Sequence, residues 1–482
     1  MTVIRQVRCR ADSGYGADFF NAAAAIVGSE AVLTGGAAGP YCADKRGRYL
    51  GSALAVVFPA DTQQVAEIVK LSVANQIAIV PQGGNTSLCG ASVPLAEGGR
   101  QIVLNLSRMK RIRAIDPVNY TMTVEAGCIL ADVRQAAEQH NRLFPLELTA
   151  TLHHCEIGGN LSTNAGGNGV LRYGNARDLV LGLEVVLPDG RIWNGLRSLR
   201  KNNSGYDLKH LFIGAEGTLG IITAAVLKLF PRPQSSATAI VAITDPEIAV
   251  RLLAHVRAFC GDTLSAFEII SRSSLDIVLK HVTGTAEPFA QRYEYYLLIQ
   301  SDDMQQRPLG DALRGAIQSF GTGIPEFAVT ADAGAAENWW KLRQNISDAQ
   351  KREGISIKHD ISVPVSRVAE FIARADTALR DAFPGIRIVA FGHMGDGNIH
   401  YNASMADAAQ NEIFIEQQEG AVNNLVYQVV RELDGSISAE HGVGQLKRET
   451  LRDYKDPLEL ELMRSIKQVF DPQGLMNPGK VL

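Results

Sequence analysis

The apolar pattern of the first part of the chain predicts alternating strands and helices. Residues 53–58 are an apolar run of strand length, and residues 61–64 (Asp-Thr-Gln-Gln) have the composition of a helix N-terminus. Apolar positions between residues 65 and 73 recur on one helical face, and residues 77–80 are apolar again. This pattern predicts a strand–helix–strand unit.

The same α/β character continues to residue 230. Further strands are predicted at residues 101–106, 121–126 and 221–230, and a helix at residues 130–139. Residues 179–193 predict a hairpin, because Pro188-Asp189-Gly190 is a turn sequence between two apolar runs.

Three loops rich in Gly and Asn interrupt this region, at residues 81–90, 157–169 and 214–220. They contain too few bulky side chains to form a packed core of their own. Their backbone N–H groups are therefore exposed and can bind a ligand. Such groups form concave sites for anions, above all phosphate. Three of these loops in one region indicate a single long ligand that carries phosphate.

The pattern changes at residues 231–236, Pro-Arg-Pro-Gln-Ser-Ser. The residues that follow mix strand and helix periods without glycine loops, and they include a predicted strand at 294–300 and a charged helix at about 339–353. Because 482 residues exceed one compact core, we expect two or three domains. The chain ends in a rigid loop rich in Pro and Gly at residues 471–480.

Two histidines flank an Asp-Gly pair in residues 391–402, Phe-Gly-His-Met-Gly-Asp-Gly-Asn-Ile-His-Tyr-Asn. A two-residue hairpin turn at residues 396–397 would place His393 and His400 directly cross-strand, with Cβ atoms roughly 5 Å apart. Asn402 would share the face of His400 by period two. The pair could hold one metal ion, or it could be part of a polar surface.

Glu440 and His441 stand side by side in a second candidate loop, residues 438–444, Ser-Ala-Glu-His-Gly-Val-Gly. A carboxylate from this loop could complete a metal site with His393 and His400. Two imidazoles and one carboxylate leave coordination positions open, which is typical of a catalytic rather than a structural site.

Composition excludes several classes of protein. A net charge of −4 with 20% charged residues provides no basic surface for nucleic acid, and no run of eighteen apolar residues predicts a transmembrane segment. The cysteines have no Cys-x-x-Cys spacing, which argues against an iron–sulfur cluster, a zinc knuckle and a disulfide framework; they are Cys9, Cys42, Cys89, Cys128, Cys155 and Cys260. A reducing, cytoplasmic location fits best.

The N-terminus allows two interpretations. Arg5, Arg8 and Arg10 precede the first acidic residue, Asp12, as in a mitochondrial presequence. The alternative, which we favour, is a disordered start of the chain. The expected location is therefore the cytoplasm, or the mitochondrial matrix if the source is eukaryotic.

Taken together, the three glycine loops, the histidine hairpin and Glu440-His441 resemble the FAD-linked D-2-hydroxy acid dehydrogenases of the vanillyl-alcohol-oxidase superfamily. The resemblance covers residues 40 to 482 in five ordered motifs. It implies an α+β fold with a two-subdomain FAD-binding domain of the p-cresol methylhydroxylase (PCMH) type (residues 1–232), an α+β substrate cap (233–439) and a C-terminal segment that returns to the FAD domain (440–482).

The resemblance implies that the three glycine loops and the closing loop hold FAD. The matching positions are Gly83, Gly84, Asn85, Thr86, Ser87, Gly159, Asn160, Thr163, Asn164, Gly166, Gly167, Glu216, Gly217, Gly220, Ile221 and Asn477. Some relatives link the flavin covalently through a histidine directly after the first Gly-Gly, where this chain has Asn85. We therefore expect non-covalent FAD. Cys155 lies near a second linkage position of distant relatives, and we interpret it as a small buried hydrophobe.

The resemblance also implies roles around the substrate. His393, His400 and Glu440 match metal ligands, zinc being the expected ion, and His441 matches the catalytic base. Substrate contacts match Arg343, Ser347, Lys358 and Asn402, with Ser347 replacing a Thr. Taken alone, Arg343 and Lys358 would be interpreted as solvated surface charges, and we expect a structural role for His359.

These residues fit the oxidation of a 2-hydroxy acid. A metal would hold its carboxylate and hydroxyl, and His441 would take the hydroxyl proton as hydride leaves Cα for flavin N5. Arg343 and Lys358 favour a second carboxylate on the substrate, as in D-2-hydroxyglutarate or D-malate. The alternative within the family is D-lactate or glycolate. Electrons are expected to leave to an electron-transfer flavoprotein or a quinone, and a homodimer is the base-rate expectation.

Three other classes of protein remain as alternatives. A zinc hydrolase would have no use for the glycine loops, and the chain has no His-Glu-x-x-His. A nicotinamide dehydrogenase would need Gly-x-Gly-x-x-Gly after a strand, which is also absent. A non-catalytic flavin-binding electron-relay protein would need FAD but neither a metal nor a base.

Overall fold

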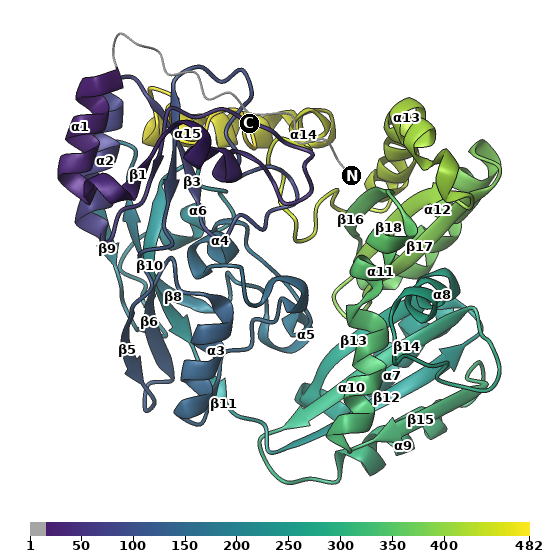
Figure 1. Cartoon of the computed structure of the whole chain (residues 1–482). Helices are drawn as coiled ribbons and strands as arrows, with labels where there is room; N and C mark the ends of the chain where they lie inside the picture. Colours follow the sequence, from purple (N-terminus) through teal and green to yellow (C-terminus); the bar gives the residue numbers. More distant parts are fainter. Residues whose placement is uncertain (1–15) are drawn as a thin grey trace.

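The computed structural model describes residues 16–482, and the chain forms two large parts that lie side by side (Figure 1). The elements up to β11 (Phe230–Pro231), with the C-terminal helices, build one part, and the elements from β12 (Ser235–Ile243) to α13 (Asn411–Glu432) build the other. The interpretations of Arg5, Arg8 and Arg10 concern residues outside the described range.

The first part begins with a four-stranded sheet in the order β1-β2-β4-β3. Its strands are β1 (Val32–Leu33), β2 (Val56–Val57), β3 (Ala78–Gln82) and β4 (Gln101–Asn105), and β2 and β3 each run parallel to β4. Helix α2 (Thr62–Ala74) begins after Asp61, whose carboxylate accepts the N–H of Gln64 at 2.8 Å. Helices α1 (Gly16–Val27) and α2 share the apolar core of this sheet, which confirms the predicted strand–helix–strand unit.

A five-stranded antiparallel sheet in the order β5-β6-β10-β8-β9 forms the second layer. Its strands are β5 (Ile112–Asp116), β6 (Thr121–Glu125), β8 (Val180–Val186), β9 (Ile192–Gly195) and β10 (Ile221–Lys228). The short strands β7 (Arg142–Leu143) and β11 pair beside it, and its helices are α3 (Leu130–Gln139), α4 (Ile157–Ser162), α5 (Val170–Tyr173) and α6 (Lys209–Phe212). The predicted hairpin over residues 179–193 and the helix at 130–139 are confirmed.

The second glycine loop is not a loop throughout. Residues 157–162 form helix α4, with the side chain of Leu161 in the core and Gly158 pressed against Ala126. A Cβ on Gly158 would lie 2.7 Å from the Ala126 side chain, so glycine permits this contact. Composition alone does not reveal the helix, because its stability comes from packing rather than from helix propensity.

The second part is built on a seven-stranded antiparallel sheet in the order β15-β12-β14-β13-β17-β18-β16. Its further strands are β13 (Leu264–Ser271), β14 (Tyr295–Asp303), β15 (Glu326–Thr330), β16 (Ile357–Ser362), β17 (Ile386–His393) and β18 (Asn398–Met405). Both faces are covered, since along β12 Val241 belongs to one apolar core and Ile240 to the other.

Helices cover the two faces of this sheet. On one face pack α7 (Pro246–Cys260), α9 (Leu309–Phe320), α12 (Val368–Ala382) and α13. On the other pack α8 (Arg272–His281), α10 (Ala333–Gln344) and α11 (Ile346–Glu353). The prediction of one charged helix over about 339–353 is wrong in this respect: the helix breaks at Asn345, which ends α10 and begins α11.

The histidine hairpin forms, but the predicted two-residue turn at residues 396–397 is wrong. Strands β17 and β18 are joined by a four-residue loop, residues 394–397, and the pairs in register are His393 with Asn398 and Phe391 with His400. The loop is anchored because the Met394 side chain is fully buried and Gly395 N–H donates to Phe267 O of β13 at 2.9 Å. His393 and His400 are therefore diagonal neighbours, with ring centroids 5.7 Å apart.

The C-terminal segment returns to the first part. Helices α14 (Arg448–Tyr454) and α15 (Pro457–Phe470) run along the top of the first part in Figure 1, and Ile466 and Phe470 of α15 pack against the apolar core of the five-stranded sheet. Residues 475–477 then run along β3, where Ile79 N–H donates to Leu475 O and Asn477 N–H donates to Ile79 O, both at 2.8 Å. Among residues 16–482, no disulfide forms and no helix is long and apolar enough to cross a membrane.

Candidate active site

The predicted site residues converge on one cavity of about 1210 Å³ between the two parts. The first part contributes the three glycine loops, the second part contributes α11, β16, β17 and β18, and residues 440–447 complete the wall. Every predicted cofactor, metal, base and substrate residue lines this cavity except Asn164 and Asn477. Residues more than three hundred positions apart in the sequence are thus brought to one place.

The first glycine loop presents unused hydrogen-bond donors to the cavity. Within the described chain, no backbone N–H of residues 83–88 donates to a protein atom, and all of these residues line the cavity. Buried or semi-buried N–H groups need a partner, and a row of them suits the phosphates of a dinucleotide. The loop therefore fits the pyrophosphate of FAD.

Glycines give this part of the cavity its shape. A Cβ on Gly84 would lie 1.8 Å from His154 O, so the first glycine loop can approach the segment before α4 only because position 84 has no side chain. At Gly159 nothing lies within 4 Å of the missing Cβ, so the space in front of it is open to a ligand. Asn85 adopts a left-handed conformation, and its amide donates to Ala43 O.

Several of the residues matched to FAD make side-chain hydrogen bonds within the protein. The Glu216 carboxylate accepts N–H groups of residues 443 and 444, at 2.7 and 2.8 Å. The Asn477 amide donates to Ala91 O and to Glu216 O, and Asn164 Oδ1 accepts the N–H of Arg177. These side chains hold the walls together behind the cavity surface, and a direct contact with FAD stays a prediction for each.

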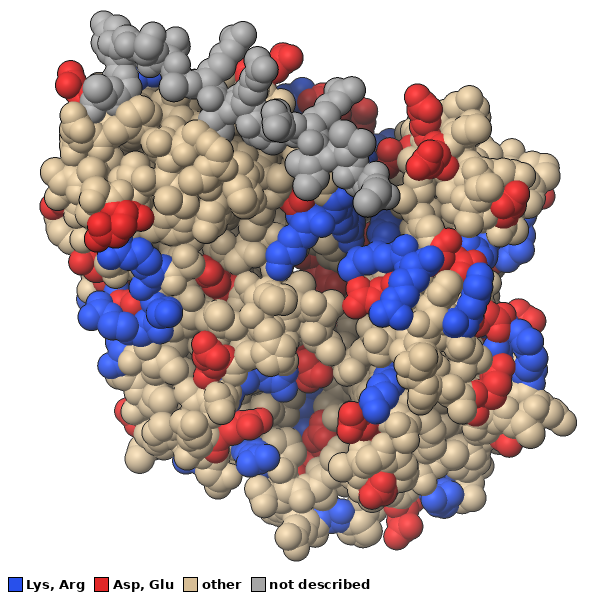
Figure 2. Space-filling model, viewed as in Figure 1, with Lys and Arg blue, Asp and Glu red and all other residues tan. Residues whose placement is uncertain are grey.

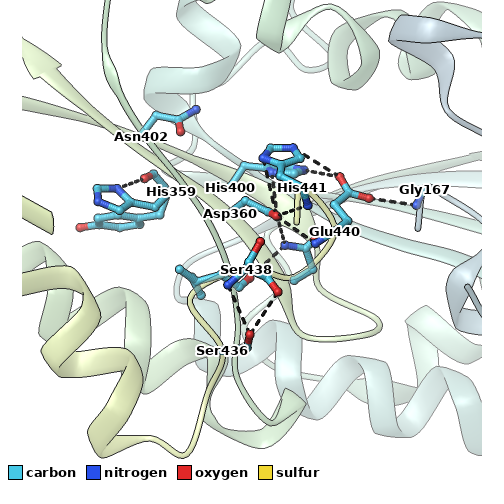
Figure 3. Close-up of polar contacts among 12 residues, drawn as sticks. Gly167, His359, Asp360, His400, Asn402, Ser436, Ser438, Glu440 and His441 are labelled. Atoms are coloured by element: carbon cyan, nitrogen blue, oxygen red, sulfur yellow. Dashed lines mark hydrogen bonds and ion pairs between the residues drawn. The ribbon is translucent and has the colours of Figure 1, made fainter. Parts of the chain in front are cut away.

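A cluster of imidazoles and carboxylates also lines the cavity (Figure 3), and its Glu440 accepts the N–H of Gly167 from the second glycine loop at 3.1 Å. One ligand atom from each of Asp360, His400, Glu440 and His441 lies within 4.8 Å of the others. Of the predicted triad, His400 and Glu440 meet here, with 3.6 Å between Nε2 and Oε1, and His393 lies alongside His400. Nitrogen and carboxylate ligands of this kind suit zinc.

Carboxylates behind the two hairpin histidines orient their rings. His393 Nδ1 is 2.8 Å from Glu268 Oε1, and His400 Nδ1 is 3.7 Å from Asp360 Oδ1. In metal sites a ligating histidine commonly donates its other ring N–H to a carboxylate, which directs the free nitrogen at the ion. The donor set that could hold a cation thus contains His400 and Glu440 of the predicted triad, together with Asp360 and His441, while His393 is not among the four. A place for His393 in the metal site stays a prediction.

His441 lies between Asp360 and His400. Its Nδ1 is 3.6 Å from Asp360 Oδ2, its ring stacks on that of His400 with centroids 5.6 Å apart, and its side chain is 27% exposed. Burial raises the pKa of Asp360, but the charges of His441, Lys447 and His400 outweigh burial and hold that pKa well below its usual range. The ring thus turns Nδ1 toward Asp360, and its Nε2 lies 3.9 Å from Glu440 Oε1.

The positive groups expected to hold the substrate face the cavity rather than the outer surface. Arg343 is buried: its Nε donates to Glu268 Oε2 at 2.7 Å, while its Nη2 has no partner in the described chain. Lys358 is half-buried, and burial, followed by the charge of Arg46, lowers its pKa to about 8. The interpretation of Arg343 and Lys358 as outer surface charges is therefore wrong.

Positive charge also surrounds the mouth of the cavity. Lys and Arg side chains gather on the viewed face where the two halves meet (Figure 2), and Lys45, Arg46, Arg48 and Lys351 line the cavity there. An anionic small molecule is attracted to such an opening although the net charge of the chain is −4.

His359 has the structural role expected for it. Its ring nitrogens lie 2.8 Å from Tyr401 O and 2.8 Å from Asn423 Oδ1, and the residue is 1% exposed. Burial lowers the pKa of His359 to about 4. The uncharged ring ties β16 to β18 and α13.

No sequence motif pointed to Glu268 and Asp360, which lie behind His393 and His400. For Glu268 a pattern was nevertheless present, because it is the one charged residue of the fully buried strand β13, whereas Asp360 follows Lys358 and His359 in the mixed strand β16. Acidic residues are almost never fully buried unless they are paired, so a lone carboxylate in an apolar strand indicates a polar partner in the fold.

Comparison with known proteins agrees with this arrangement. The family model "FAD linked oxidases, C-terminal domain" matches residues 232–481, and the model "FAD binding domain" matches residues 53–195. Among solved structures, p-cresol methylhydroxylase with substrate bound has a TM-score of 0.77 at 18% identity, covering 96% of both chains. Alkyldihydroxyacetonephosphate synthase has a TM-score of 0.72, also at 18% identity, covering 96% of this chain and 86% of that chain. The predicted α+β fold of the p-cresol methylhydroxylase type is confirmed.

Three curated relatives are all named for D-2-hydroxyglutarate. D-2-hydroxyglutarate dehydrogenase, mitochondrial, of Arabidopsis thaliana is 37% identical over 439 residues, covering 90% of this chain and 76% of the relative. D-2-hydroxyglutarate dehydrogenase of Xanthomonas citri pv. viticola is 36% identical, covering 92% of both. D-2-hydroxyglutarate–pyruvate transhydrogenase of Saccharomyces cerevisiae is 33% identical, covering 90% of this chain and 88% of the relative. The chain therefore belongs to the FAD-linked oxidases and, within them, to the family of the D-2-hydroxyglutarate dehydrogenases.

Proposed function

We propose that this protein oxidises a D-2-hydroxy acid with a second carboxylate, most simply D-2-hydroxyglutarate or D-malate, to the 2-keto acid. The observation that carries the proposal is the single cavity in which the flavin loops, the imidazole–carboxylate cluster and the cations Arg343 and Lys358 meet. A non-catalytic electron-relay protein would need only the first of these three features. We also propose residues 1–232, 233–439 and 440–482 as FAD domain, cap and returning segment.

Non-covalent FAD and a divalent cation, proposed to be zinc, would be the cofactors. When bound, FAD supplies a hydride acceptor and the cation supplies a Lewis acid that acidifies a hydroxyl group. The glycine loops at residues 83–87, 159–167 and 216–221 would hold FAD, and His393, His400 and Glu440 would hold the cation.

The chain's own groups would bind and orient the substrate. Arg343 Nη2 needs an acceptor, and the Lys358 ammonium forms no hydrogen bond or ion pair within residues 16–482. A carboxylate placed between them would satisfy both, with Ser347 and Asn402 lining the same wall. D-lactate and glycolate have no second carboxylate and remain the alternative substrates.

His441 would move the proton. With Nδ1 directed at Asp360, Nε2 would accept the proton of the substrate hydroxyl, and Asp360 would stabilise the imidazolium that forms. The electron acceptor is proposed to be an electron-transfer flavoprotein or a quinone. The name of the yeast relative adds another acceptor, pyruvate, which would enter the same cavity.

Substrate choice tests the dicarboxylate proposal. kcat/KM for D-2-hydroxyglutarate or D-malate is expected to exceed that for D-lactate by at least about tenfold, or about 1.4 kcal/mol. Lys358→Met and Arg343→Ala should each lower kcat/KM for the dicarboxylates about tenfold or more, mainly through KM, and change D-lactate turnover much less. The control is Lys455→Met, which removes an exposed ion pair between Lys455 and Glu459. A preference of the wild type for D-lactate would contradict the proposal.

The role of His441 is tested by flavin reduction in a stopped-flow experiment. His441→Ala should slow reduction by the hydroxy acid on the order of 10²-fold or more, because the hydroxyl proton loses its acceptor. The substrate concentration at half-saturation should change little. The matched control is His255→Asn. It removes an exposed imidazole on α7 that is hydrogen-bonded to Ser319 on α9. Wild-type reduction rates in His441→Ala would show that another group is the base.

Non-covalent FAD is tested by precipitation. Acid precipitation of the purified protein should leave all yellow colour in the supernatant, because Asn85 cannot form the covalent link that a histidine forms at this position. The absorption spectrum of supernatant and washed pellet measures the outcome. Flavin that stays with the polypeptide would point to Cys155 or another linkage.

Glu156 makes the stability of the flavin-free protein depend on pH. It is buried beside Gly83, its Oε2 has no partner in the described chain, and burial raises its pKa to about 8. The folded state then binds more protons than the unfolded state between pH 4.5 and about 8, so the free energy of unfolding falls as pH rises through this window.

Glu156→Gln removes this dependence. The free energy of unfolding of Glu156→Gln minus that of wild type should be larger at pH 9 than at pH 5 by roughly 1–4 kcal/mol. Denaturant unfolding after removal of FAD measures both values. Glu459→Gln, at an exposed position of α15, serves as control. An equal difference between Glu156→Gln and wild type at both pH values would show that Glu156 ionises as an ordinary carboxyl group.

A further inference from the structure

The segment that carries Glu440 and His441 has little internal structure to hold it. Residues 436–447 form neither strand nor helix, and Gly442 and Gly444 adopt left-handed conformations, with φ of 78° and 53°. Its internal hydrogen bonds include Ser438 Oγ to Gly442 O at 2.6 Å. The positions of Glu440 and His441 must therefore be fixed mainly from outside the segment.

From the cap side, Asp360 holds the first half of the segment. Its Oδ2 accepts the backbone N–H of Glu440 at 2.9 Å and of His441 at 2.8 Å (Figure 3). Its Oδ1 accepts the amide of Asn398 at 2.9 Å, and its backbone O accepts Ala439 N–H at 3.1 Å. Asp360 is 1% exposed, so these contacts are shielded from water.

From the FAD side, the glycine loops hold the second half. Glu216, 6% exposed, accepts the N–H groups of Val443 and Gly444, at 2.7 and 2.8 Å. The fit is tight, because a Cβ on Gly442 would lie 2.8 Å from Glu216 Oε1. The Glu440 carboxylate itself accepts Gly167 N–H at 3.1 Å (Figure 3).

The segment thus lies between two buried carboxylates, one from each part of the molecule. Its buried Lys447 donates to Ile437 O at 2.8 Å and interacts electrostatically with both carboxylates. Buried charges are costly unless compensated. Here each carboxylate is compensated by consecutive peptide N–H groups, which fixes the direction of the backbone between them.

We propose that Asp360 and Glu216 are positioning residues, which act through the backbone of residues 440–444 to set Glu440 and His441 against the cation and the substrate. The inference rests on the proposed function. It means that a flavin loop and the cap strand β16 must both be in place for the cation site to be complete, so the two cofactor sites depend on each other.

Three variants of the full-length, FAD-loaded protein test this. Asp360→Asn and Glu216→Gln keep the size of each side chain and remove its charge. Glu184→Gln is the matched control, because Glu184 is also a buried carboxylate, bonded to Thr62 and Thr223, but does not line the cavity. Bound cobalt is measured at graded free Co²⁺ after chelation, together with kcat, KM for D-2-hydroxyglutarate and thermal stability.

Asp360→Asn and Glu216→Gln should each weaken Co²⁺ binding and lower kcat by about 10–100-fold, with KM within about twofold of wild type. Glu184→Gln should lose only thermal stability. Co²⁺ binding and kcat equal to wild type in both variants would overturn the inference, whatever their thermal stability. If Asp360→Asn does not fold, Glu216→Gln decides by the same criteria.

A separate measurement on the wild type tests the proposed function itself. If the wild-type flavin is not reduced by any D-2-hydroxy acid, the proposed function fails. If the wild type is active and the variants match it, only the positioning role of Asp360 and Glu216 fails.

Discussion

Buried carboxylates hold the site together, and the rest of the architecture depends on each of them having hydrogen-bond donors. Asp360 and Glu216 accept peptide N–H groups of residues 440–444, and Glu268 joins His393 to Arg343. Burial raises the pKa of Glu268, but the charges of His393 and Arg343 outweigh it and keep that pKa below its usual value. Each carboxylate is thus tied to a fixed donor geometry, because an unpaired buried charge would be far more costly.

The cavity follows from two sheets that are rigid for different reasons. The cap sheet is covered on both faces by helices, so the histidine hairpin β17–β18 is held in its register. The FAD half instead ends its strands in glycine loops that close on each other where no Cβ could fit. One wall therefore offers side chains in fixed positions, and the other offers backbone N–H groups. A flavin and a chelating hydroxy acid need these two kinds of wall.

Much of this could be predicted from the sequence, and the failures have physical causes. The glycine loops, the helix at residues 130–139 and the pairing of His400 with Glu440 were within reach, because each depends on local composition or on a short motif. The turn at residues 394–397 was not, since its length depends on the burial of Met394 against distant strands. Glu268 and Asp360 were missed because their partners are distant in the sequence: His393 lies 125 residues from Glu268, and Asn398 and Glu440 lie 38 and 80 residues from Asp360. The placement of Arg343 and Lys358 was misjudged for the same reason.

The central claim is that a cation held by His393, His400 and Glu440 lies beside the flavin and holds a 2-hydroxy acid there. The most direct measurement is anaerobic bleaching of the flavin by a panel of D- and L-2-hydroxy acids, with and without a chelator. The account predicts rapid bleaching by D-2-hydroxyglutarate or D-malate, none by the L-enantiomers, and loss of bleaching after chelation that divalent metal restores. Equally rapid bleaching by the chelated protein would contradict it.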